Sequence, residues 1–218
     1  MPTRASQAGR VWVTMTRWSG PLAGASFVAG IAGAMTLSDA PYPRPGADVA
    51  TVQRYFSGNA GAARMSVAGQ LVSAASLAVF TRSVVRLAER SGDRGLRIRA
   101  LAGGTVATLT LVASALASAA LTGGAGRDGV RAARLHRLVF LTGGAAHNVG
   151  LGLLVSSLGR AGSRSGELPA SLTRAAAAAS TVALLSPLSL AAPPTMVAIP
   201  AGRFSSLLVS GLSGPRII

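Results

Sequence analysis

The chain has 218 residues, of which 50% are hydrophobic and 12% charged, and its mean hydropathy is +0.48. Its formal net charge of +15 comes from 21 arginines and six acidic residues. The arginines flank apolar runs instead of forming one basic tract, which argues against a nucleic-acid-binding protein. The absence of cysteine and lysine excludes disulfides, cysteine-based metal sites, Walker A loops and Schiff-base chemistry.

The apolar residues gather into runs of about 17 to 24, the length that a helix needs to cross a bilayer of about 30 Å. We therefore predict an all-α fold, a polytopic transmembrane helix bundle with about six spans. The expected partner of the chain is therefore the lipid bilayer. A single transmembrane domain is expected over residues 20–213.

The N-terminal residues 1–19 are polar and predict a cytoplasmic tail, with Met15 as an alternative start to Met1. The first span is expected at 20–37. A cleaved signal peptide is the alternative interpretation, because a basic start, a short apolar stretch and the small-x-small sequence at 32–34 are all present.

Residues 38–64 form the longest predicted loop, which opens with three prolines that favour an extended course. Asp48 is a reasonable N-cap, and Val49, Val52 and Phe56 repeat at helical spacing, so we expect a short amphipathic helix at the membrane surface. An ordered loop that covers the end of the bundle is favoured over a functional lid.

Five further spans complete the prediction, at 65–85, 100–121, 138–158, 175–191 and 195–213, followed by a tail at 214–218. A hairpin at Pro193-Pro194 would separate the last two spans. The alternative has five spans, with residues 175–199 crossing once and Arg203 at the outer interface.

The arginine count predicts orientation. If the N-terminus is cytoplasmic, the inner segments hold 13 arginines and the outer segments seven, with Arg203 left within a span. The inner ones are Arg4, Arg10, Arg17, Arg82, Arg86, Arg90, Arg94, Arg97, Arg99, Arg160, Arg164, Arg174 and Arg216. The outer ones are Arg44, Arg54, Arg64, Arg127, Arg131, Arg134 and Arg137. This bias predicts a multi-pass protein of the plasma membrane with both termini cytoplasmic.

Small residues at intervals of four predict close helix contacts. Gly20 and Gly24 form one such series, and Ala25, Ala29 and Gly33 form a second. Gly144, Asn148 and Gly152 form a third.

The stretch "FLTGGAAHNVGLGLL", residues 140–154, places the polar pair His147 and Asn148 inside an apolar run. With Arg203 near the middle of the last span and Gln70 in the second, they form the candidate intramembrane polar site. The simpler interpretation is hydrogen bonding between helices, worth about 0.6 kcal/mol on average. The sharper one is that His147 faces a polar pocket and relays protons, while Arg203 faces the bundle interior.

No catalytic residue, metal site or cofactor is predicted. "GAGRDG", residues 124–129, satisfies GxGxxG but follows a span instead of a strand, so it indicates a turn. His136 and His147 are 11 residues apart, about 16 Å along a helix, too far to share a metal ion. There is no HExxH sequence and no paired-carboxylate site, so an enzyme is not favoured.

The Asn59-x4-Arg64 element, the span exit "LAVFTRSVVRLAER" and the segment "IPAGRF" resemble small multi-spanning membrane proteins of high-GC actinobacteria, a family of unknown function. The resemblance implies a six-helix integral membrane protein and nothing about substrate. The strong Ala, Gly and Arg bias is also typical of a GC-rich bacterial genome.

Two function classes remain. The first is a non-catalytic helix bundle that packs with itself, as a homo-oligomer, or with a membrane partner. The alternative is a small permease or lipid-handling protein with a polar intramembrane site around His147, Asn148 and Arg203.

Overall fold

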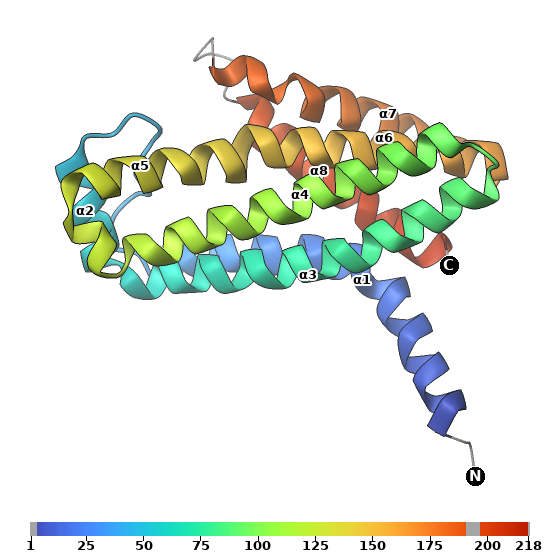
Figure 1. The fold of residues 1–218 in the computed structure, drawn as a ribbon, viewed down its shortest axis with the longest axis horizontal. Helices are drawn as coiled ribbons and strands as arrows, with labels where there is room; N and C mark the ends of the chain where they lie inside the picture. The colour runs from blue at the N-terminus through green and yellow to red at the C-terminus, as the bar shows by residue number, and fades with distance from the viewer. Residues whose placement is uncertain (1–3, 191–196, 218) are drawn as a thin grey trace.

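The computed structural model describes residues 4–190 and 197–217, and within these ranges every regular element is a helix (Figure 1). The all-α prediction is therefore confirmed for the described part of the chain. The predicted hairpin at Pro193-Pro194 lies outside it.

Long helices run back and forth along one direction (Figure 1). They are α1 Arg4–Thr36, α3 Ala60–Arg90, α4 Arg94–Leu121, α5 Gly129–Phe140 continued by α6 His147–Ser165, α7 Ala170–Leu185 and α8 Ala198–Ser213. Each packs against the next in space, in the order α1, α3, α4, α6, α7, α8, and α8 returns to α1. The bundle is thus closed, and α6 also touches α3 and α8 across it.

The two ends of the bundle contain different elements. At one end, Arg90 binds Glu167 and Arg164 binds Asp93, which joins the turn between α3 and α4 to the turn between α6 and α7. Both chain termini lie toward this end (Figure 1). At the other end lie the short helix α2, Val49–Gly58, and the 3-10 turn Gly124–Arg127.

Helix α2 forms where the sequence predicts it. The Asp48 carboxylate accepts a hydrogen bond of 2.8 Å from the Thr51 N–H, which caps the helix start. Val52, Tyr55 and Phe56 are buried on one face, and the loop before α2 packs Tyr42 against both rings, at 5.2 and 5.8 Å between centroids. The loop and helix therefore make an ordered cover over this end of the bundle.

Three helices of the described chain are long and apolar enough to cross a membrane: Ala60–Arg90, Arg94–Leu121 and the continuous helix Gly129–Ser165. Six spans are not confirmed, because α1 is not one of these three helices and because α7 and α8 have only 16 residues each. The five-span alternative needs one helix over 175–199, but α7 ends at Leu185 and α8 begins at Ala198.

Several helices extend beyond the predicted spans. Helix α1 begins at Arg4, within the predicted tail, and α5 begins at Gly129, within a predicted outer loop. An arginine interrupts an apolar run and so ends a predicted span, but it does not end the helix, because arginine is a good helix former. Helix α5 begins where Asp128 caps the Arg131 N–H at 3.0 Å.

All five predicted packing glycines face a neighbouring element. A Cβ atom at Gly20 would meet the Ser210 carbonyl, at Gly24 it would lie 3.6 Å from the Leu207 carbonyl oxygen, and at Gly33 it would lie 2.8 Å from Met65. Gly144 faces Ile199 on α8, whereas Gly152 faces Leu184 on α7. Two further close crossings, in which glycines of two helices face each other, were not predicted: Gly30 with Gly69 and Gly103 with Gly150.

Candidate functional site

The polar pair His147 and Asn148 stands directly after a π-helical segment, Leu141–Ala146, that separates α5 from α6 within one continuous helix. Both side chains are buried, with 1% and 0% of their surface exposed. The wider π turn contains Gly143 and Gly144, and π segments inside α-helices occur often at functional sites.

His147 connects α6 to the middle of α4. Its Nδ1 atom lies 2.8 Å from the carbonyl oxygen of Ala107, which is about half-way between the helix ends Arg94 and Leu121. A carbonyl oxygen only accepts, so Nδ1 carries the proton and, in the neutral ring, Nε2 does not.

Asn148 connects α6 to the start of α8. Its Nδ2 donates a hydrogen bond of 2.8 Å to the carbonyl oxygen of Ile199. Its Oδ1 atom is buried and has no hydrogen-bond partner among the described residues. Because Asn148 follows His147 directly, α8 begins at about the same depth as the middle of α4.

Arg203 lies one helical turn beyond Ile199 on α8. Its guanidinium carbon is 4.7 Å from the centre of the Phe27 ring on α1, a cation-π contact, and Phe27 packs edge-on against Phe204. The residue is partly exposed as a whole, but its Nε and Nη2 atoms are buried and have no partner among the described residues.

No acidic residue balances this charge in the described part of the chain. The described ion pairs use the carboxylates of Glu167, Glu89, Asp128 and Asp93, which lie at helix ends or in the turn between α6 and α7. Asp39 lies in the loop after α1, and Asp48 caps α2. A charge in the bundle interior without an acidic partner is costly, so Arg203 is an unusual group there.

Gln70 stands apart from this cluster. Its Nε2 donates to the Ser66 hydroxyl at 3.2 Å within α3, and its Oε1 is buried without a partner among the described residues. No described hydrogen bond connects it to the other three. The structure joins His147 to Ala107 and Asn148 to Ile199, and Ile199 lies one helical turn before Arg203 on α8. The contact residues Phe27, Ala107 and Ile199 were not predicted from the sequence.

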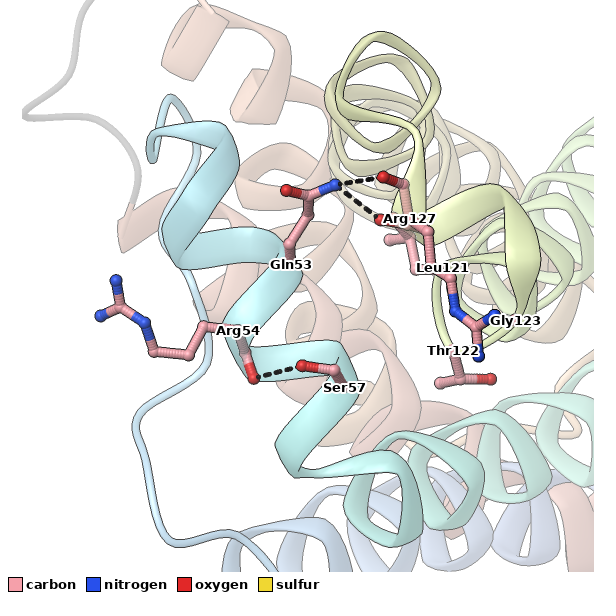
Figure 2. Close-up of a pocket in the computed structure, with 8 residues that line it drawn as sticks. Gln53, Arg54, Ser57, Leu121, Thr122, Gly123 and Arg127 are labelled. Atoms are coloured by element: carbon pink, nitrogen blue, oxygen red, sulfur yellow. Dashed lines mark hydrogen bonds between the residues drawn. The ribbon is translucent and has the colours of Figure 1, made fainter.

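A separate pocket of about 430 Å³ lies at the α2 end of the bundle. Figure 2 shows Gln53 reaching across it from α2, where its Nε2 donates to the carbonyl oxygens of Gly126 and Arg127, at 3.0 and 2.9 Å. Arg54 points away from this bridge (Figure 2). The "GAGRDG" segment forms one wall as a 3-10 turn, followed by α5.

The described residues contain no group of three or more His, Asp or Glu side chains that would hold a metal ion. Comparison of the chain with protein-family models, with curated proteins and with solved structures finds no match.

Proposed function

We propose that this chain is a non-catalytic integral membrane protein, a six-span helix bundle of the plasma membrane that packs with itself or with a membrane partner. The observation that carries the proposal is the hydrogen bonding of the two buried polar residues, His147 and Asn148. His147 and Asn148 both hydrogen-bond to backbone carbonyls of neighbouring helices, which is how polar side chains hold helices together in a membrane.

The exposed surface supports a bilayer environment. On α4, Leu101, Leu109 and Leu116 are 55%, 62% and 60% exposed. On α8, Phe204 and Leu208 are 43% and 63% exposed. Large apolar side chains on the outside of several helices are unfavourable in water and favourable in lipid.

The arrangement of arginines supports both termini being cytoplasmic. Arg90 and Arg164, from two segments with many arginines, lie at the same end of the bundle because each pairs with a carboxylate in the other's turn. The chain termini lie toward that end (Figure 1). The positive-inside rule then favours this end as the cytoplasmic one.

Native mass spectrometry of the detergent-purified chain tests the proposed packing. The expected result is a second copy, or a co-purified membrane protein, that stays bound after the detergent is removed. A monomer that carries no protein partner at any detergent concentration would contradict the proposal.

A second candidate function is a small permease or lipid-handling protein. One observation favours it: the two buried nitrogen atoms of Arg203 that have no partner among the described residues. A retained small molecule or lipid in the same experiment would support this candidate.

A further inference from the structure

Arg203 presents one complete edge of its guanidinium group without a partner. Nε and Nη2 point their hydrogens to the same side, so together they form a fork that matches two oxygens of one anion. Both atoms are buried, and neither has a hydrogen-bond partner among the described residues.

The same chain shows this edge in use. At the bundle end, Nε and Nη2 of Arg90 donate to the two carboxylate oxygens of Glu167, at 3.0 and 2.9 Å. Arg203 offers the same pair of donors in the interior, where the described chain supplies no carboxylate.

The free N–H donors of Arg203 lie along the edge of its guanidinium group, away from the face that Phe27 covers. Phe27 lies against one face of the guanidinium group, at 4.7 Å. Helix α8 begins five residues before Arg203, and the residue preceding it, Val197, makes no side-chain cap. The positive end of the α8 dipole is therefore about one turn from the guanidinium group, which adds to the attraction for an anion.

We propose that Arg203 is the centre of an internal oxyanion site, which binds a carboxylate or phosphoryl group through Nε and Nη2 about half-way along the bundle. The proposal rests on the second candidate function and names the class of its ligand. Two carriers of this chemistry exist, a small soluble anion and an anionic lipid.

Thermal unfolding of the purified chain in nanodiscs of neutral phosphatidylcholine tests the site. Sodium acetate and inorganic phosphate are compared with sodium chloride at equal ionic strength. At about tenfold above the dissociation constant, we expect acetate or phosphate to raise the Tm of the native chain by about 3 to 6 °C.

Variants of Arg203 locate the effect. Arg203→Gln should abolish the rise, and Arg203→Lys should remove most of it, because lysine keeps the charge but lacks the fork. Arg54→Gln is the matched control, since it also removes one arginine, from an exposed position on α2. It should keep the full rise. If Arg203→Gln does not fold, the comparison of Arg203→Lys with the native chain decides.

A lipid arm identifies the carrier. Nanodiscs that contain phosphatidylglycerol, measured in chloride alone, should raise the Tm of the native chain above that of Arg203→Lys if a lipid carries the oxyanion. The proposal is overturned if neither soluble anion nor lipid raises the Tm, or if Arg203→Lys responds as the native chain does. Membrane crossing and partner binding are measured separately, so they can fail without affecting this result.

Discussion

Gly150 on α6 shows how single residues set the spacing of the helices. A Cβ atom there would meet the backbone nitrogen of Ala107 and lie 2.8 Å from both the Ala107 Cα atom and the Gly103 carbonyl oxygen. Backbone atoms on both sides cannot give way, so Gly150→Ala should force α4 and α6 apart. We expect the free energy of unfolding to fall by about 1 to 3 kcal/mol.

Gly61→Ala on α3 is the control, because nothing lies within 4 Å of its added Cβ atom. It should be neutral or slightly stabilising in the same denaturation experiment, since alanine favours helices more than glycine does. Equal losses in the two variants would show that the crossing at Gly150 is not tight.

Asn148 is the second residue whose role can be measured. Asn148→Leu removes the hydrogen bond to the Ile199 carbonyl, and we expect a loss of about 0.6 kcal/mol in the free energy of unfolding. Ser205→Ala is the comparison, because that hydroxyl bonds only to carbonyls of its own helix. A variant as stable as the native chain would mean that Asn148 does not hold α6 to α8.

The site could be predicted only in part at this scale. His147, Asn148 and Arg203 are visible in the sequence because each is polar within an apolar run. Their contacts cannot be read from the sequence, because the acceptors are the backbone carbonyls of Ala107 and Ile199, and every residue has a backbone carbonyl. Phe27 has no distinguishing pattern either, and its role depends on α1 lying beside α8.

At the scale of elements, Asp93 decides where α4 begins. Its carboxylate accepts from the Leu96 N–H at 2.9 Å and also binds Arg164. The Leu96 hydrogen bond, and then Arg164, lower the pKa of Asp93 below its ordinary value. A depressed pKa means that the carboxylate stabilises the fold above its unfolded pKa of about 3.9, and this contribution is lost as the pH falls through the folded value.

We therefore expect Asp93→Ala to lower the Tm at pH 7 by about 2 to 4 °C, and Asp93→Asn, which keeps the cap, to lower it less. Between about pH 5 and pH 2, the Tm of the native chain should fall more steeply than that of Asp93→Asn. Parallel pH profiles for the two proteins would contradict this role of Asp93.

Helix boundaries differ from the predicted spans for a physical reason. Hydropathy marks where a chain is apolar, whereas helices end where backbone hydrogen bonds end. Helix α5 therefore includes Arg131, Arg134 and Arg137, which the sequence predicts in an outer loop. The π segment Leu141–Ala146 has no sequence signature beyond its two glycines, so the local widening beside His147 was not predicted.

At the scale of the whole molecule, the all-α fold class was predictable because the apolar residues gather into runs of helical length, which are typical of a helix bundle. The closure of the bundle was not predictable, because it depends on the packing of α8 against α1, which no local sequence pattern indicates. The bundle has one end with the α3–α4 and α6–α7 turns and another with α2 and the Gly124–Arg127 turn. The central claim is that these ends face opposite sides of a membrane.

Cysteine labelling in intact cells tests that claim most directly, because the native chain has no cysteine and gives no background. Ser57→Cys places a thiol on the exposed surface of α2, and Arg94→Cys places one at the exposed start of α4. A membrane-impermeant maleimide added outside should label the thiol at position 57 at once and the thiol at 94 only after permeabilisation. Labelling of both positions from outside, or of 94 alone, would contradict the proposed topology.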